Sequence, residues 1–282
     1  MTTPRVAFEG GLTVLISVYI KCDAELFERA LASVYANTLL PDEVLIVADG
    51  PLSDGVNAVL ERYGRERGTR VLRLPVNRGL ARALNVGLGQ VRTTWVARAD
   101  QDDINLPRRF ELLAQMVARI GRVDIIGGNI LEVDNDGRAL AQRHVPETHA
   151  EIVRYARHRS PFNHMTVVFR RDSVAAAGGY PEIMTQDYGL WAAMLGRGQV
   201  AANLQEILVH ATTGSDMYRR RAGLKYARSE IEMQRLLVHH GLKSPVAGVL
   251  DGAVRAAVFL LPNWMRALVY ERLLRKPADA SS

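Results

Sequence analysis

Short apolar runs alternate with segments of helical periodicity along the first half of the chain. Runs rich in β-branched residues predict buried strands at residues 12–19, 43–48, 70–74 and 94–99. Between them, apolar residues spaced three and four apart predict amphipathic helices at 26–34, 56–63 and 80–88. Strand–helix alternation with short connections is typical of a parallel sheet covered on both faces. The pattern therefore predicts an α/β fold, with a mostly parallel, Rossmann-like central sheet flanked by helices.

The second half of the chain is less regular. We expect a helix at 108–120, a strand at 124–133, a strand at 165–169 and a helix within 180–196. Near residue 216 the sequence becomes basic and helical. It therefore predicts an α/β unit at 1–215 and a helical C-terminal extension at 216–282.

Composition narrows the class of protein. The 282 residues are 48% hydrophobic and carry a net charge of +6, so we expect a globular core and an anionic partner. Cys22 is the single cysteine, which favours a reducing compartment and a structural role for this thiol. The first residues do not resemble a signal peptide, and no apolar run reaches the roughly 18–20 residues of a membrane span. We therefore expect a cytoplasmic protein that at most lies on a membrane surface.

Carboxylates directly follow the second and fourth predicted strands. They are Asp49 after the second, and Asp100, Asp102 and Asp103 after the fourth. Parallel sheets bind ligands beyond the carboxyl ends of their strands. Because side chains alternate along an extended segment, Asp100 and Asp102 point the same way and suit an oxygen-liganded Mg²⁺ or Mn²⁺ ion. The alternative is a solvated turn in which Asp103 caps a helix that starts at 104–107.

Several short motifs occur in a fixed order along the chain. They are 14–19 (VLISVY), 49–50 (DG), 77–80 (NRGL), 83–85 (ALN), 98–103 (RADQDD), 162–164 (FNH), 178–180 (GGY) and 186–191 (QDYGLW). Together they make the chain similar to family 2 glycosyltransferases over roughly residues 12–221, especially to bacterial enzymes of amylovoran and capsule synthesis. The resemblance implies the A-type glycosyltransferase fold and a nucleoside-diphosphate sugar as donor.

The resemblance also implies a donor site. The donor contacts that it implies are Ser17, Tyr19, Asp49, Asn77, Arg78 and Asp100. Asp49 would meet the nucleoside and Asp100 the ribose or sugar, whereas Asp102 would bind Mn²⁺ or Mg²⁺ together with the diphosphate. Relatives often carry a second acid where this chain has Ala48. From the residues alone, Asp49 and the segment 77–79 can also be interpreted as ordinary turns.

On the acceptor side, the resemblance places the general base at Asp187. An inverting transfer needs a carboxylate that takes the proton of the attacking acceptor hydroxyl. His164 and Gln186 would contact the acceptor, although relatives usually have Glu at the position of Gln186, and His210 loosely matches a further metal or phosphate ligand. The residues alone also allow a helix-capping role for Asp187 and a structural, hydrogen-bonded role for His164.

The C-terminal region has features of its own. The arginines at 219–221 either close over a pyrophosphate or lie on a solvated helix face. Residues 246–261 predict a helix that is apolar except for a narrow polar stripe of Gly248, Asp251, Gly252 and Arg255. Beyond it, 264–276 mixes Trp, Leu and Arg, which suits a helix in a membrane interface, or one docked on the catalytic unit or on a dimer partner.

Together these features predict an enzyme that transfers a sugar from a nucleoside-diphosphate sugar to a saccharide or lipid-linked saccharide. The resemblance implies inversion and a role in synthesis of cell-surface polysaccharide such as capsule or lipopolysaccharide. The alternative is a nucleotidyltransferase that makes the sugar nucleotide, but such enzymes usually carry a Gly-rich basic loop where this chain has 20–23 (IKCD). Nucleic-acid binding is not expected, because aromatic residues make up 6% and no basic–aromatic stacking motif occurs.

Overall fold

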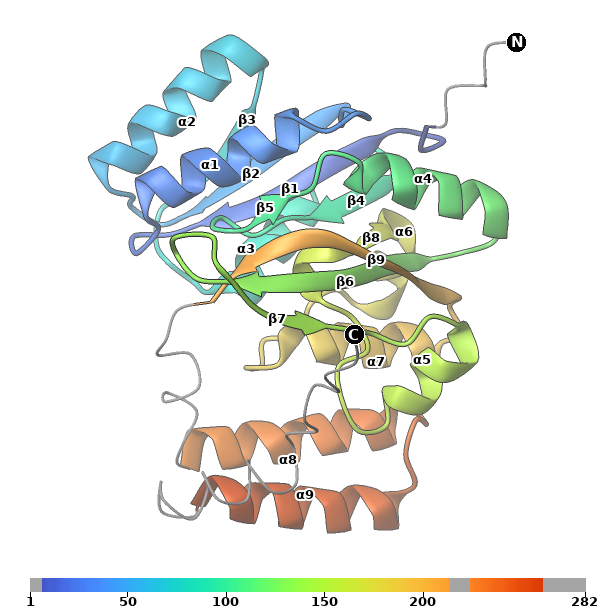
Figure 1. The fold of residues 1–282 in the computed structure, drawn as a ribbon. Coiled ribbons are helices and arrows are strands. Elements are labelled where there is room, and N and C mark those ends of the chain that lie inside the picture. Colours follow the sequence, from blue (N-terminus) through green and yellow to red (C-terminus); the bar gives the residue numbers. More distant parts are fainter. Residues whose placement is uncertain (1–6, 214–223, 261–282) are drawn as a thin grey trace.

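A mixed sheet forms the centre of the computed structural model, which describes residues 7–213 and 224–260 (Figure 1). Its strands are β1 (Leu12–Val18), β2 (Glu43–Asp49), β3 (Arg70–Leu74), β4 (Trp95–Arg98), β5 (Ile104–Asn105), β6 (Ile125–Val133), β7 (Ala139–Arg143), β8 (Val168–Arg170) and β9 (Ala201–Thr212). They are ordered β3-β2-β1-β4-β8-β6-β9-β5, and β7 pairs with β6.

The predicted parallel arrangement holds in the N-terminal part of the sheet. There β3, β2, β1 and β4 are neighbours and run parallel, with Val14 opposite both Val44 and Ala97. β8 then runs antiparallel between β4 and β6, and β5 and β7 are also antiparallel to their partners. An antiparallel strand needs no crossover helix, so strand–helix alternation does not reveal it. The α/β fold is confirmed, and its sheet is mixed where the sequence predicted a mostly parallel one.

Helices cover both faces of this sheet (Figure 1). They are α1 (Ala24–Tyr35), α2 (Asp54–Arg67), α3 (Leu80–Leu88), α4 (Arg109–Ile120), α5 (His149–Tyr155), α6 (Arg171–Ala177), α7 (Gln186–Gly196), α8 (Leu224–His239) and α9 (Pro245–Leu260). Alternation along β1 sends Val14 and Ile16 into the core under α1, α2 and α4, and sends Leu15 into the core with α3 and α7. Each fully buried aliphatic side chain contributes about 1.5–3 kcal/mol to this packing.

The segment 104–107 is not the helix start that its sequence suggests. Ile104 and Asn105 form β5, which pairs with His210 and Val209 of β9, and α4 begins only at Arg109. A two-residue strand exists because of its partner, and that partner lies far along the chain. The sequence likewise does not predict β7, β9, α5 or α6.

The C-terminal helices form an antiparallel pair beside α7 (Figure 1). α8 packs on α7 through Met233 and Leu237, which share a core cluster with Trp191. α9 approaches α8 so closely that a Cβ on Gly248 would lie 2.5 Å from Val238 Cγ2. The predicted C-terminal apolar helix is thus confirmed as α9. Within the described ranges, no helix is long and apolar enough to cross a membrane.

Candidate active site

The parallel strands end at one edge of the sheet, where most of the predicted donor residues lie. β2, β1 and β4 are adjacent, so their carboxyl ends lead side by side toward Asp49, Tyr19 and Asp100. Ser17 is buried near the end of β1, whereas Tyr19 is exposed beyond it. This edge therefore presents polar side chains from three strands, as the sequence predicts.

Asp49 joins the end of β2 to the turn that precedes α3. Its two carboxylate oxygens accept hydrogen bonds from the backbone N–H groups of Arg78 at 2.8 Å and Gly79 at 2.9 Å. Gly50, at a φ of +86°, lies against this turn, and a Cβ there would be 2.6 Å from the Asn77 nitrogen. Charge-assisted bonds of this kind are strong, so Asp49 fixes the segment 77–79 against the sheet edge. The structure thereby brings two predicted donor motifs together.

Residues 100–103, here called the acid loop, leave β4 under tight constraint. The buried guanidinium of Arg98 forms an ion pair with Asp100. Asp103 is buried and accepts the Thr212 N–H at 2.8 Å, while the Thr212 hydroxyl donates to the Asp102 carbonyl at 2.6 Å. Asp103 thus ties the acid loop to the end of β9. Its alternative role as a helix cap is wrong, since Arg108 occupies the N-cap of α4.

The acid loop concentrates negative charge in a poorly solvated place. Burial, and next the charge of Asp100, raises the pKa of Asp102 from 3.8 to about 6. Burial and the charges of Asp100 and Asp102 also raise the pKa of Asp103 well above its ordinary value. Desolvation and like charges both disfavour ionised carboxylates. A cation bound here would relieve this repulsion.

Two buried arginines, Arg98 and Arg109, lie beside the acid loop, and their sequence pattern predicts no role for either. Arg109 donates to the carbonyl of Arg98 at 2.7 Å and to Oδ1 of Asn105. Burial, and next the charge of Arg98, lowers the pKa of Arg109 to about 9. Among the residues described, Nε and Nη1 of Arg98 have no hydrogen-bond partner. Buried donors of this kind are usually satisfied by a water or a ligand.

The acid loop fits a Mg²⁺ or Mn²⁺ ion that a substrate helps to hold. In the described part of the chain, no three His, Cys, Asp or Glu side chains form a set able to hold a metal. Asp100 is engaged by Arg98 and Asp103 by Thr212, which leaves Asp102 the least committed carboxylate. Magnesium is commonly held by one or two carboxylates together with substrate phosphates. The residues therefore suit an ion completed by a diphosphate.

A second polar cluster lies at the start of α7. Nε2 of His164 is 3.0 Å from the hydroxyl of Tyr180, and both rings pack edge-on against Trp191. Asp187 lies half-buried in the first turn of α7. Its carboxylate makes no hydrogen bond or ion pair with another described residue. Within the described ranges, nothing therefore competes with a ligand hydroxyl for this carboxylate.

Electrostatics link this cluster to the acid loop. Burial, and next the charge of Arg98, lowers the pKa of His164 to about 4, while the charges of Asp187 and Asp100 act in the opposite direction. Burial raises the pKa of Tyr180, and the same three charges act on it. Asp100 and Asp187 are thus both close enough to influence the same two groups. His164 is neutral at pH 7, which suits a hydrogen-bonding residue.

Asn85 connects α3 to this second cluster. Its Oδ1 accepts the Tyr180 N–H at 2.8 Å, and its Nδ2 donates to the Tyr180 carbonyl at 2.8 Å. Residues 95 positions apart are thereby held at a fixed spacing. This contact brings the motifs 83–85 and 178–180 together in space.

Some predicted residues make fewer contacts. The side chains of Asn77 and Arg78 are exposed, and the side chain of Gln186, at the start of α7, has no hydrogen-bond partner among the described residues. His210 pairs with Ile104 through the sheet, but it belongs to no set of metal-binding side chains within the described ranges. The arginines at 219–221 and the segment 264–276 lie outside the described residues.

Comparison with known proteins decides the family. The model for "Glycosyl transferase family 2" matches residues 13–177, which is more than half of the chain. The chain belongs to glycosyl transferase family 2. The resemblance stated from its motifs is thereby confirmed, and this family 2 protein is a glycosyltransferase.

The sequence similarity to two relatives extends over nearly the whole length of those proteins. The amylovoran biosynthesis glycosyltransferase AmsE of Erwinia amylovora is 36% identical, with 92% of this chain and 98% of the relative covered. The UDP-Gal:alpha-D-GlcNAc-diphosphoundecaprenol beta-1,3-galactosyltransferase of Escherichia coli is 35% identical, with 94% and 96% covered. The solved mannosyltransferase PcManGT of Pyrobaculum calidifontis, in complex with GDP-Man and Mn²⁺, shares the fold, with a TM-score of 0.61, 17% identity, and 95% and 81% covered. None of these supports a nucleotidyltransferase.

Proposed function

We propose that this glycosyltransferase moves a sugar from a nucleoside-diphosphate sugar to a saccharide or lipid-linked saccharide during synthesis of a cell-surface polysaccharide. The printed names of its relatives support this, one for amylovoran biosynthesis and one for a diphosphoundecaprenol-linked acceptor. One observation carries the proposal most strongly. The Arg98 N–H donates to the Val167 carbonyl at 2.9 Å, and His164, three residues before Val167, packs on Trp191 of α7, so a donor at the acid loop and an acceptor at α7 would meet.

On the donor side, the wall formed by Asp49 and the segment 77–79 would face the nucleoside, with Ser17 and Tyr19 beside it. Asp100 would contact the ribose or sugar, and Asp102 would hold Mn²⁺ or Mg²⁺. When bound, such an ion neutralises charge that develops on the departing diphosphate. The solved mannosyltransferase with Mn²⁺ supports this assignment through its fold alone.

On the acceptor side, Asp187 would act as the general base. It takes the proton of the acceptor hydroxyl while that oxygen bonds to the anomeric carbon and the bond from this carbon to the diphosphate breaks. Attack opposite the leaving group inverts the anomeric configuration. His164, neutral and held by Tyr180, and Gln186 would orient the acceptor by hydrogen bonds.

Binding of the donor is tested by thermal unfolding in the presence of sugar nucleotides. A ligand that binds only the folded protein stabilises it by about 2.7 kcal/mol at a hundred times its Kd. We expect at least one nucleoside-diphosphate sugar to raise the Tm, and Mn²⁺ to increase the shift. Nucleoside triphosphates serve as the comparison. Protection by a triphosphate alone would contradict the proposal and favour a nucleotidyltransferase.

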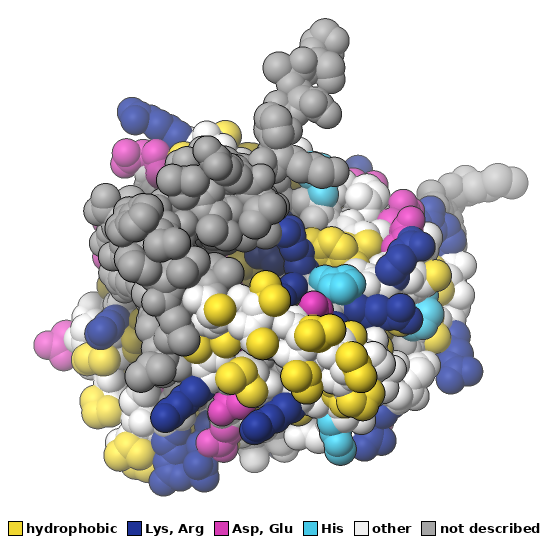
Figure 2. Space-filling model, turned by 90° about the horizontal axis from the view of Figure 1, so that it is seen from below, with side chains coloured by type: hydrophobic (Ala, Val, Ile, Leu, Met, Phe, Trp, Pro, Cys, Tyr) yellow, Lys and Arg dark blue, Asp and Glu magenta, His cyan; other side chains and the backbone are white. Residues whose placement is uncertain are grey.

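We further propose that residues 1–215 catalyse and that residues 216–282 hold the enzyme on the inner face of the cell membrane. α9 supports this role, because its outward face is apolar. Val246, Val249, Leu250 and Val254 are 61–72% exposed. Figure 2 views the molecule from below and shows hydrophobic side chains gathered on this side. Large exposed apolar patches mark membrane or protein contacts.

The polar stripe of α9 supports the same proposal, because its charged side chains, although partly exposed, bond to the rest of the protein. Asp251 accepts from the Lys243 ammonium at 2.5 Å, and Arg255 donates to the His158 carbonyl at 2.6 Å. The helix therefore uses its polar groups for docking and leaves its apolar groups outside. This is the orientation expected of a helix in a membrane interface.

Charged residues on the outer face of α9 test the membrane contact. We expect the double variant Val249→Glu, Leu250→Glu to lose at least about fivefold in cosedimentation with phosphatidylglycerol vesicles, because about 0.8 kcal/mol is lost per CH₂ withdrawn from lipid. Leu140→Glu, at an exposed position of β7, is the matched control. Equal vesicle binding by the double variant would contradict the proposal. So would a sedimentation experiment in which the unmodified protein is a dimer and the double variant a monomer.

A further inference from the structure

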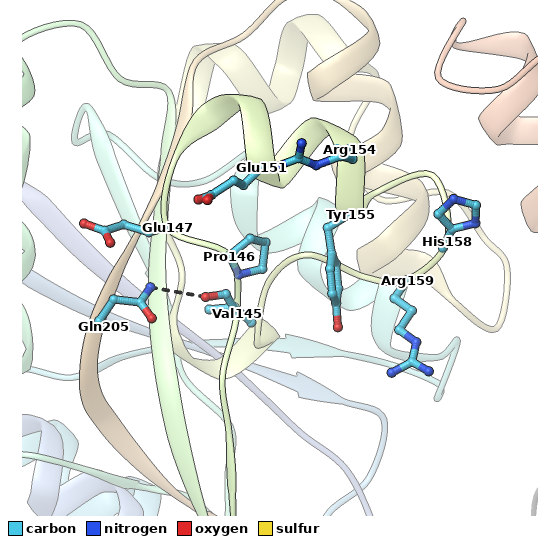
Figure 3. Close-up of a pocket in the computed structure, with 9 residues that line it drawn as sticks. All are labelled: Val145, Pro146, Glu147, Glu151, Arg154, Tyr155, His158, Arg159 and Gln205. Carbon is cyan, nitrogen blue, oxygen red and sulfur yellow. Dashed lines mark hydrogen bonds between the residues drawn. The ribbon is translucent and has the colours of Figure 1, made fainter. Parts of the chain in front are cut away.

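A cavity of about 640 Å³ opens between α5, the β7–α5 connection and β9 (Figure 3). None of the acid-loop residues, and neither His164 nor Asp187, lines it. It is therefore distinct from the candidate active site, and neither the family motifs nor the relatives' names give it a role. Its volume lies in the range of small-molecule binding sites.

Buried amides hold the β7–α5 connection in place. Asn129 of β6 accepts the Val145 N–H at 2.9 Å and donates to the Gln205 carbonyl at 2.7 Å. Asn203 of β9 donates to the Pro146 carbonyl at 2.7 Å. Both asparagines are fully buried, and both amides bond to the backbone that forms the cavity wall, although Oδ1 of Asn203 has no partner among the described residues. The cavity is thus preorganised.

A bulge in β9 shapes the same wall. The successive β6 residues Gly128 and Asn129 pair with Leu204 and Ile207, so the two residues between these partners leave the ladder. One of them, Gln205, is exposed and lines the cavity. Bulges re-aim side chains and are common beside functional sites.

The lining combines a flat apolar surface with mixed polar groups. Figure 3 shows the ring of Tyr155 beside Pro146 and Val145, with charged side chains around them. Arg154 and Arg159 are balanced by Glu147 and Glu151, so the cavity has little net charge. A phosphate site would need an excess of positive charge. Hydroxyl groups, which both donate and accept, match such a mixed set.

We propose that this cavity binds a neutral saccharide. A sugar ring would pack on Tyr155, and its hydroxyls would bond to the amide of Gln205 and the guanidinium of Arg159. In the described part of the chain, the Arg159 guanidinium has no ion-pair partner, so it is free for a ligand. The site would hold a part of the acceptor or product glycan remote from the reacting hydroxyl, a role that rests on the proposed function.

Saturation-transfer NMR on the full chain tests this site with the disaccharide galactosyl-β1,3-N-acetylglucosamine as probe. We expect binding by the unmodified protein and by Arg157→Ala, an exposed neighbour that does not line the cavity. Arg159→Ala and Tyr155→Leu should each bind at least fivefold more weakly. Arg159 is exposed, so Arg159→Ala is expected to fold. This variant therefore tests saccharide binding even if Tyr155→Leu fails to fold.

Several results would overturn the proposal. They are no binding by the unmodified protein, equal binding by Arg159→Ala and Arg157→Ala, and full displacement of the disaccharide by inorganic phosphate. Donor protection in thermal unfolding is measured on the same variants. Loss of saccharide binding in Arg159→Ala with intact donor protection would support a saccharide site in this cavity. Absence of donor protection in the unmodified protein would contradict the proposed function instead.

Discussion

Asp187→Asn is expected to lower kcat by about 10²–10⁴-fold, the usual contribution of a general base. Asparagine keeps the size and a hydrogen-bond acceptor but cannot take the proton of the acceptor hydroxyl. Asp187 makes no hydrogen bond or ion pair with another described residue, so the substitution removes no internal bond that the structure shows. Donor affinity, measured by thermal protection with Mn²⁺, should stay unchanged because the acid loop is intact.

The matched control is Asp172→Asn, which removes an exposed acid from the first turn of α6. If Asp187 only stabilised the start of its helix, each variant would lose about 0.3–1 kcal/mol of unfolding free energy and both would keep their activity. Full activity of Asp187→Asn would exclude this residue as the base. A loss of donor binding would instead place Asp187 on the donor side.

Asp102→Asn is expected to stabilise the metal-free protein at pH 7.5 by up to about 3 kcal/mol, while it abolishes protection by Mn²⁺. The pKa of Asp102 is about 6 in the folded protein and 3.8 ordinarily, and each unit corresponds to about 1.36 kcal/mol. The raised value means that folding disfavours the ionised form. The penalty is therefore fully present above pH 6, shrinks as the pH falls, and disappears only below the ordinary pKa of 3.8, where the carboxyl is protonated in both states.

Urea unfolding in EDTA at several pH values measures this effect. The stability difference between Asp102→Asn and the unmodified protein should be largest near pH 7.5 and much smaller at pH 4. A difference that grows as the pH falls would contradict the electrostatic account. Unchanged Mn²⁺-dependent donor protection in the variant would contradict its role at the metal. Stability sacrificed at a functional position is a common feature of enzymes.

The sequence predicts those parts of the fold whose signals are local. The strands β1, β2 and β3 and the helices α1 to α4 carry clear periodicity, and their bounds differ little from the expected ranges. β5 and β9 are not predicted from the sequence, because Ile104 and Asn105 become a strand only by pairing with a segment about a hundred residues later. The register of β9 is further obscured by its bulge, which breaks the alternation of buried and exposed residues.

In the candidate site too, features with local signals are predicted from the sequence, whereas contacts between distant segments are not. Strand ends bring Asp49 and Asp100 to one edge, which pattern and topology together predict. The two hydrogen bonds from Asp49 to the turn before α3, and those between Thr212 and the acid loop, depend on tertiary contacts that no local pattern contains. The buried charge of Arg109 is equally invisible, because arginine in a sequence reads as a surface residue.

The central claim is that the acid loop and Asp187 serve one transfer reaction. Its most direct test supplies the purified protein with Mn²⁺, a panel of sugar nucleotides and an N-acetylglucosaminyl-diphosphate lipid, and follows the products by mass spectrometry. The account predicts nucleoside diphosphate and glycosylated lipid in equal amounts, with both lost in Asp102→Asn and in Asp187→Asn. Full turnover in both variants, or pyrophosphate formed from a nucleoside triphosphate and a sugar phosphate, would contradict it.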